Sequence, residues 1–219
     1  AQSVWDSSFK AVYHMNDATT STILDATSNA NHGTKKGANE PIEATGKVGQ
    51  GQDFDGSDDY IQITDDNALD LTNFTLECFT KLDAFEATSS ESFLIAKGTY
   101  PGYNYRLVAN DTEGSGVFSV ASYINGTFRN VSTTAGYNTG TWYHVVGKFD
   151  GTDLEMFVNG TQDGTANYSG TAGTNTADVY LGKYSGGNYN LDGIEDETRI
   201  SSTARSTAWI GATYDSLWD

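Results

Sequence analysis

The chain has one cysteine, two prolines and three histidines among its 219 residues. A disulfide within the chain needs two cysteines, so Cys78 cannot form one, and we expect it to be a small core residue. No hydrophobic run approaches the length of a membrane span, which argues against membrane insertion. The scarcity of cysteine therefore predicts a fold that is held by its core and its hydrogen bonds.

Positive charge is also scarce. There are 12 lysines and arginines against 29 aspartates and glutamates, and the formal net charge is −17. Nucleic acids and anionic membranes attract basic surfaces, so this balance argues against both as partners. Such acidity suits a saline exterior or a protein that binds cations, and it is explained equally well by solubility alone.

Glycine, tyrosine and threonine are abundant, as in short strands joined by turns. In 142–160, WYHVVGKFDGTDLEMFVNG, large side chains occupy both faces of the strand predicted over 142–149. This pattern is typical of a strand covered on both sides, or of one with a core face and a ligand face. Asp150-Gly151 and Asn159-Gly160 predict turns, because glycine accepts the positive φ that tight hairpins need.

Similar short strands recur along the rest of the chain. The longest early strand is predicted over Phe74–Leu82, and Tyr60–Ile63 is predicted to form a hairpin with Phe54 across Asp55-Gly56. Only Thr203–Ala212 has a helical pattern. No repeat or linker is visible, so 1–219 is predicted to be one domain. The fold class is therefore all-β: a two-sheet antiparallel β-sandwich, with jelly-roll topology and one short C-terminal helix.

Four sequence blocks carry a family resemblance. They are VYHMND with DATSNANHG (12–17 and 25–33), FDGSDDYI (54–61), the segment 142–160, and GIEDETRI (193–200). In this order they resemble the LamG-like jelly-roll domains of the concanavalin A-like lectin/glucanase superfamily. The resemblance covers most of the chain and implies the same sandwich fold.

The loop 25–33 is rich in oxygen ligands. Calcium prefers six to eight oxygens in flexible geometry, but the spacing is not that of an EF-hand, and an ordinary Asx-rich turn explains the residues equally well. The resemblance favours a metal, because such domains often hold one structural Ca²⁺ between this loop and an aspartate of the last strand. It implies Asp25, Asn29, His32 (through its backbone oxygen) and Asp196 as ligands.

Glu195, Asp196 and Glu197 invite a catalytic interpretation, because glycosidases use two carboxylates. Strand alternation would place Glu195 and Glu197 on one face, with Arg199 as an ion-pair partner of Glu197. The E-x-D-x-x-E pattern of the superfamily's glucanases and the signatures of its lyases are absent. We therefore expect no catalytic residues. His14 and His144 are interpreted as hydrogen-bonded sheet histidines rather than as a zinc site or a catalytic base.

Two aromatic loops, GTYPGYN (98–104) and YSGGNYN (184–190), are the best binding candidates. Tyrosine rings stack on the apolar faces of sugars, and arginine grips acidic sugars. Packing at the edge of the sandwich explains the same tyrosines equally well. The candidate ligand-binding residues are Tyr100, Tyr103, Tyr105, Arg106, Arg129, Tyr184 and Tyr189.

Three functions remain open at this point. The first is a non-catalytic, extracellular or cell-surface module that binds a polysaccharide or glycan, is stabilised by Ca²⁺ and belongs to a larger multidomain protein. The second is a glycoside hydrolase or lyase on the same fold. The third is a structural spacer that binds a protein. Fold likeness alone does not decide among them.

Overall fold

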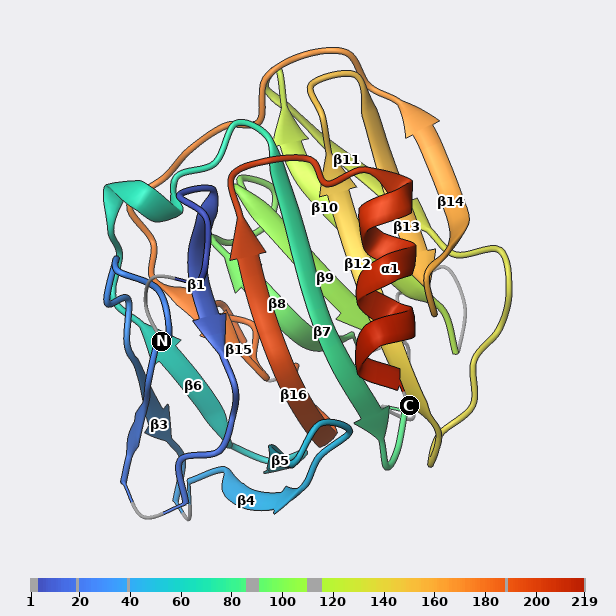
Figure 1. Ribbon diagram of the computed structural model, residues 1–219. Coiled ribbons are helices and arrows are strands. Elements are labelled where there is room, and N and C mark those ends of the chain that lie inside the picture. The colour runs from blue at the N-terminus through green and yellow to red at the C-terminus, as the bar shows by residue number, and fades with distance from the viewer. Residues whose placement is uncertain are drawn as a thin grey trace.

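The computed structural model describes residues 4–18, 20–38, 40–85, 91–109, 116–187 and 189–218. Two antiparallel sheets stack face to face, which confirms the predicted β-sandwich (Figure 1). In spatial order, the first sheet contains β14 (Thr161–Asn167), β13 (Asp153–Val158), β12 (Trp142–Phe149), β7 (Phe74–Leu82), β16 (Asp192–Ser201), β5 (Gln50–Asp55) and β4 (Ile42–Thr45), with β1 (Phe9–Tyr13) paired to β16.

The second sheet contains, in spatial order, β11 (Thr127–Ser132), β10 (Phe118–Ile124), β9 (Tyr105–Ala109), β8 (Ser92–Lys97), β15 (Val179–Leu181), β6 (Tyr60–Ile63), β3 (Gly33–Lys36) and β2 (Thr22–Ile23). A single 3₁₀ turn, η1 (Asn67–Leu69), follows β6. No helix in the described part of the chain is long and apolar enough to cross a membrane.

The core lies between the inner faces of the two sheets. Phe74 is central, with its ring centroid 5.8 Å from that of Tyr105 and 6.1 Å from that of Phe149. Cys78 is fully buried in this core, as the sequence predicted. The two sheets approach each other closely at Gly147, because a Cβ added there would lie 2.6 Å from a methyl carbon of Val120.

The C-terminal helix begins and ends later than the sequence suggested. It is α1 (Thr207–Trp218) rather than 203–212. The side-chain oxygen of Ser206 accepts from the backbone N–H of Trp209 at 3.2 Å and so caps the first turn. The backbone N–H of Arg205 donates to Oγ1 of Thr75 at 2.9 Å, so the residues before Ser206 are held on β7 rather than in the helix.

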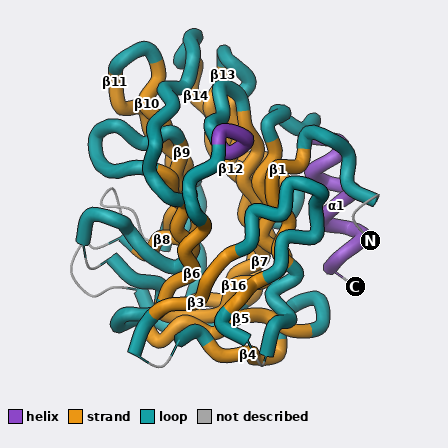
Figure 2. Tube along the Cα trace, turned by 90° about the vertical axis from the view of Figure 1, so that its left-hand side faces the viewer, coloured by secondary structure: helices purple, strands orange, loops and turns teal. Residues whose placement is uncertain are grey.

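The helix covers the outer face of the first sheet, and β8–β11 lie on the opposite side of the molecule (Figure 2). Ile210 packs against Val146 and Phe157 there. This explains why β12 carries large side chains on both faces: one face meets the core and the other meets α1.

The central hairpin is confirmed, since β12 pairs with β13 around 150–153 and β13 pairs with β14 around Asn159-Gly160. The hairpin predicted between Phe54 and Tyr60–Ile63 is wrong. β5 pairs with strands of the first sheet and β6 with strands of the second, so residues 56–59 cross from one sheet to the other. The turn signal was correct, but a turn signal does not say whether the chain pairs back on itself or changes sheets.

Gly147→Ala should destabilise the protein by about 1–3 kcal/mol, because the added methyl group has no space opposite Val120. Gly136→Ala is the matched control, since a Cβ there meets nothing within 4 Å. Urea unfolding of both variants measures the difference. Equal stability of the two variants would contradict the close approach of the sheets.

Candidate functional site

Aromatic side chains cluster on the outer face of the second sheet, opposite the helix. Phe93 of β8 is central: its ring centroid lies 5.1 Å from that of Tyr184 in a stacked arrangement and 6.2 Å from that of Tyr103. Phe93 faces outward because the pairing of β8 with β9 shifts between Phe93 and Ile95, so that Leu94 and Ile95 both join the core while Phe93 joins the outer cluster. We call this cluster the aromatic patch; it consists of Phe93, Tyr103, Phe128, Tyr184 and Tyr189.

Tyr100 stands at the edge of the aromatic patch. Its side chain is 66% exposed, and its ring meets Phe128 edge-on with 5.3 Å between centroids. The backbone N–H of Tyr100 donates to the hydroxyl of Tyr184 at 3.3 Å, which ties the two predicted aromatic loops together. On its other side Tyr100 lines an open pocket of about 360 Å³, formed by residues 98–102 and 175–177. One exposed ring therefore joins a hydrophobic surface to a pocket lined with polar groups.

Arg106 lies beneath the aromatic patch and is 4% exposed. Its guanidinium carbon is 5.2 Å from the ring centroid of Phe128 and 5.4 Å from that of Tyr103, within the range of cation–π contacts. Its Nη1 is 2.6 Å from Oε2 of Glu91. The guanidinium of Arg106 therefore packs under the rings and pairs with Glu91, and it is not exposed to a ligand.

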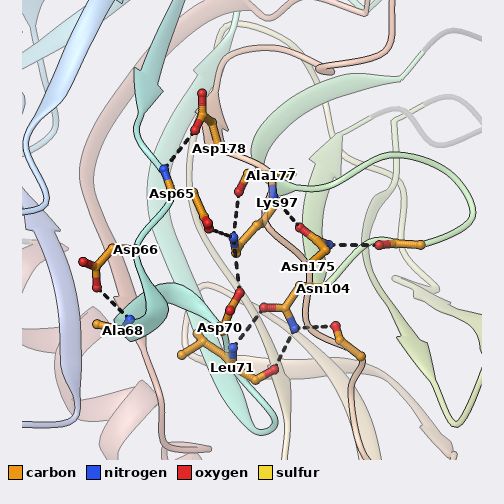
Figure 3. A network of polar contacts seen from close by, with 12 residues as sticks. Asp65, Asp66, Ala68, Asp70, Leu71, Lys97, Asn104, Asn175, Ala177 and Asp178 are labelled. Atoms are coloured by element: carbon orange, nitrogen blue, oxygen red, sulfur yellow. Dashed lines mark hydrogen bonds and ion pairs between the residues drawn. The ribbon is translucent and has the colours of Figure 1, made fainter.

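A buried lysine holds the loop that carries Tyr100. Lys97 ends β8 and is fully buried, and its ammonium group contacts the Asp65 carboxylate, the Asp70 carboxylate at 3.3 Å and the carbonyl of Ala177 at 2.6 Å (Figure 3). A buried ammonium without such acceptors would be strongly unfavourable, so these contacts fix where β8 ends.

Two asparagines extend this network to the walls of the pocket (Figure 3). Asn104 exchanges hydrogen bonds with the backbone of Leu71, at 2.9 Å to its N–H and 2.7 Å to its carbonyl. The Nδ2 of Asn175 donates to the carbonyl of Gly102 at 3.0 Å. The two sides of the pocket are thus joined to each other and to the sandwich.

Two of the predicted ligand-binding residues lie elsewhere. Tyr105 neighbours Arg106 on β9 and therefore points to the other face, where it is fully buried in the core between the sheets. Arg129 is exposed on β11 and lies over the ring of Tyr168 at 5.0 Å, beside a separate pocket of about 350 Å³. Tyr100, Tyr103, Arg106, Tyr184 and Tyr189 are the predicted residues that the structure brings together.

The structure places the predicted metal ligands in two separate hydrogen-bonded settings. The carboxylate of Asp25 accepts from the backbone N–H groups of Val12, Thr27 and Asn31 at 2.9–3.0 Å and from the Thr27 hydroxyl at 2.8 Å. These four hydrogen bonds use the acceptor capacity of the carboxylate. The arrangement is that of an Asx turn and does not fit a free oxygen ligand for a cation.

The other three predicted ligands are also held by protein groups. Nδ1 of His32 accepts from the backbone N–H of Asp25 at 3.0 Å, and the Nδ2 of Asn29 donates to the carbonyl of Phe9 at 3.0 Å. Oδ2 of Asp196 accepts from the backbone N–H of Val48 at 2.7 Å, and its Oδ1 is buried without a hydrogen-bond partner. Among the described residues, ligand atoms of Asp25, His32 and Asp196 do not gather within 4.8 Å of one another. The calcium ligands implied by the resemblance stay a prediction.

The acidic triplet is buried, and a β-bulge separates its members. Glu197 has φ of 49°, and the pairing of β16 with β7 shifts between Asp196 and Arg199. As a result Glu195 points into the core, where it accepts from the Thr198 hydroxyl at 2.7 Å. The prediction that Glu195 and Glu197 share a face is therefore wrong. The predicted pair of Glu197 with Arg199 is confirmed at 2.7 Å.

The two sheet histidines lie at the ends of one polar chain. Nδ1 of His14 is 2.6 Å from Glu197, Arg199 bridges Glu197 and Glu77, and Nε2 of His144 is 3.0 Å from Glu77. Burial alone would raise the pKa of the Glu197 carboxyl. The His14 hydrogen bond and the Arg199 charge outweigh burial and hold this pKa below its usual value, so these contacts stabilise the ionised carboxylate. Both histidines are therefore hydrogen-bonded, as predicted; His144 lies on β12, whereas His14 directly follows the end of β1.

The sequence can now be compared with known families. A model described as the concanavalin A-like lectin/glucanases superfamily matches residues 55–211, which is more than half of the chain. The chain belongs to the concanavalin A-like lectin/glucanase superfamily. This confirms the resemblance seen in the sequence motifs. A comparison with curated proteins gives no match.

Several solved structures share the fold of this superfamily member. Domain 4 of AbnA, an extracellular GH43 arabinanase from Geobacillus stearothermophilus, was solved in complex with arabinotriose; it has a TM-score of 0.75 and 17% identity, over 96% of this chain and 98% of that one. The binding domain of Paraclostridial Mosquitocidal Protein 1 has a TM-score of 0.77 and 11% sequence identity, and the match covers 95% of this chain and 52% of that one. The binding domain of botulinum neurotoxin serotype G has a TM-score of 0.71 and 8% sequence identity, and the match covers 94% of this chain and 50% of that one.

These comparisons differ in how much of the neighbour they cover. The chain spans nearly all of the arabinanase domain but only about half the length of the toxin binding domains. At such low identity the likeness shows the jelly-roll sandwich alone.

Sequence reasoning missed Phe93, Phe128 and Lys97. The sequence gives no signal for the outward position of Phe93, because an irregularity between Phe93 and Ile95 breaks the alternation of β8. Nothing in the sequence distinguishes Lys97 from a surface lysine, because its acceptors come from two distant segments.

Lys97→Met should destabilise the protein by about 2–4 kcal/mol, because it removes the cation and leaves the Asp65 and Asp70 carboxylates uncompensated at the edge of the core. Lys36→Met on β3 is the control, since Lys36 is only partly buried. Urea unfolding measures both variants. An unchanged stability of the Lys97 variant would show that the buried network is dispensable.

Glu195→Gln should change how stability depends on pH. Burial raises the pKa of Glu195 to about 8 in the folded protein, against about 4.3 in an unfolded chain. The folded state thus binds this proton more tightly, so the contribution of Glu195 to stability is present below the unfolded pKa and is lost as pH rises through the folded one. Relative to wild type, the glutamine variant should gain stability between about pH 5 and about pH 9. A difference that is constant with pH in urea unfolding would contradict this.

Proposed function

We propose that this domain is a non-catalytic, extracellular carbohydrate-binding module that holds a neutral glycan against Tyr100 and Tyr184. The observation that carries the proposal is the setting of Tyr100. A side chain that is 66% exposed is held edge-on against Phe128, with the aromatic patch on one side and a pocket on the other. An exposed ring that continues a cluster of aromatic side chains and borders a pocket is typical of a ligand-binding surface.

The chemistry of the surface matches that of a sugar. Pyranose and furanose rings offer apolar C–H groups that stack on tyrosine, together with hydroxyl groups that need hydrogen-bond partners. Thr99, Asn175 and Thr176 line the pocket next to Tyr100 and supply such partners. Because the ring is already held in place, binding costs little conformational entropy.

A neutral glycan fits better than an acidic one. Arg106 is buried and paired with Glu91, so its charge is not offered to a carboxylate or sulfate on the ligand. Arg129, the other candidate for an acidic sugar, lies at a separate pocket. The overall net charge of −17 opposes an anionic polymer as well.

The burial of the three carboxylates at 195–197 supports the proposed non-catalytic role. Glu195 and Asp196 are fully buried, and Glu197 is 5% exposed and paired with Arg199. Glycosidases need two carboxyl groups that reach the scissile bond from an open cleft. These three carboxyl groups reach no open surface in the described structure.

The setting within a larger secreted protein is drawn from the structural neighbours. The arabinanase is described as extracellular and contributes its fourth domain, and the toxin matches are binding domains about twice as long as this chain. We include in the proposal that this chain is likewise one module of a multidomain extracellular protein. A structural Ca²⁺ is also part of the proposal, supported by the excess of carboxylates.

Affinity electrophoresis through gels containing arabinan, arabinoxylan, β-glucan or alginate tests the proposal. The protein should be retarded by at least one neutral polysaccharide and not by alginate. Tyr100→Ala should weaken binding about tenfold, the loss expected for one stacked ring. Trp142→Ala, which removes a partly exposed ring from the outer face of the first sheet, should bind as wild type.

Three outcomes would overturn the proposal. If no polysaccharide slows the migration of the protein, the proposal of glycan binding is wrong. If the Tyr100 and Trp142 variants bind equally well, the glycan does not bind at the surface around Tyr100. Release of reducing ends, or of unsaturated products absorbing in the ultraviolet, from the bound polysaccharide would establish an enzyme instead.

A further inference from the structure

The turn between β5 and β6 gathers three carboxylates. Ligand oxygens of Asp55, Asp58 and Asp59 lie within 4.8 Å of one another. This is the turn that crosses from the first sheet to the second, and Gly56 gives it a positive φ of 72°. An acidic cluster in a turn is not in itself a binding site, so the orientation and the burial of its oxygens decide what it can bind.

Each carboxylate has one oxygen held by the backbone. Oδ1 of Asp55 accepts from the N–H of Ser57 at 2.8 Å, Oδ2 of Asp58 from Ala38 at 3.0 Å, and Oδ2 of Asp59 from Asp55 at 3.2 Å. Within the described structure no hydrogen bond reaches the second oxygen of any of the three. Asp59 is 3% exposed, and its Oδ1 is buried without a hydrogen-bond partner. A buried carboxylate oxygen in that state is costly unless a cation meets it.

A second buried acceptor comes from a distant segment. Asn190 precedes β16 and is 4% exposed, and its Nδ2 donates to the carbonyl of Ser57 within the same turn. Its Oδ1 is also buried without a partner. Asn190 is not acidic and does not belong to the turn, so it points to a missing partner independently of the three aspartates.

The surroundings add negative charge with little to balance it. A pocket of about 210 Å³ opens beside the turn and is lined by Glu40, Ile42, Asp53, Asp55 and Asp59. The Asp83 carboxylate lies near Asp53 and adds to this negative charge, and Lys81 is a cation near Asp53. The turn therefore lies in a strongly acidic part of the surface.

We propose that Asp55, Asp58 and Asp59 form a Ca²⁺ site that braces the crossing between the two sheets, with Asn190 Oδ1 as a further ligand. A spacing of up to 4.8 Å is about twice the Ca²⁺–oxygen distance of about 2.4 Å, so one ion can touch all three carboxylates. Carboxylate and amide oxygens at irregular positions suit Ca²⁺, which accepts flexible geometry, better than Mg²⁺, which demands a regular octahedron. Water molecules complete the coordination from the pocket side.

This site differs from the one implied by the family resemblance. The Asp25 carboxylate already accepts four hydrogen bonds, whereas three carboxylate oxygens of the 55–59 turn have none. The Ca²⁺ site is also independent of glycan binding, since it lies on residues that do not belong to the aromatic patch. Its test therefore uses no sugar, and its failure leaves the proposed glycan binding standing.

The test is a calorimetric titration of EDTA-treated, dialysed protein with CaCl₂, combined with thermal unfolding with and without CaCl₂. Wild type should bind one Ca²⁺ at this site and unfold at a higher temperature when it is present. Asp59→Asn and Asp58→Asn should each weaken that binding at least tenfold and lose the Ca²⁺-dependent gain in unfolding temperature. MgCl₂ at equal concentration should not replace CaCl₂.

Asp215→Asn, on the exposed face of α1, is the control for removing one negative charge and should behave as wild type. Asp58 is exposed, so its variant should keep the wild-type circular dichroism spectrum even if Asp59→Asn folds poorly. The proposal is overturned if wild type shows no Ca²⁺ binding, or if Asp58→Asn and Asp59→Asn bind as wild type does. It is also overturned if Asp25→Asn alone abolishes binding, because the ion would then belong to the 25–33 loop.

Discussion

Both walls of the candidate site depend on the position of one buried ammonium group. Lys97 lies at the end of β8, and its acceptors belong to the segment after β6, to the turn after η1 and to the loop before β15. A charge in this position is tolerated only when all its hydrogen bonds are made. The requirement therefore fixes the β6–β7 connection and the loop before β15 at once, and the rigid presentation of Tyr100 follows from it.

The strands and most turns were predictable because their signals are local. Alternation over 142–158 and the dipeptide Asn159-Gly160 gave the hairpins seen in the structure, and φ is positive at both residues of this dipeptide. Cys78 was correctly placed in the core for the same reason. Local periodicity reports which face a residue occupies, provided that the strand is regular.

The predictions that failed depend on contacts that are distant in the sequence or on irregular backbone. The chain changes sheets at 56–59, which the turn residues do not reveal, and the bulge at Glu197 reverses the alternation on which the shared face of Glu195 and Glu197 was based. The beginning of the helix was misjudged because Arg205 is held by Thr75, about 130 positions earlier in the chain. The position of Tyr105 was the avoidable error, since adjacent strand residues Tyr105 and Arg106 cannot share one face.

The close contact between Gly147 and Val120 also determines where any ligand can lie. Sheets that meet so tightly leave no lumen between them, unlike barrels that enclose a guest. Recognition must take place on the exterior, on loops such as 98–104 and 184–190. The exposed residues of those loops, such as Tyr100, can change without repacking the interior, so selectivity on this scaffold can diversify while the sandwich stays the same.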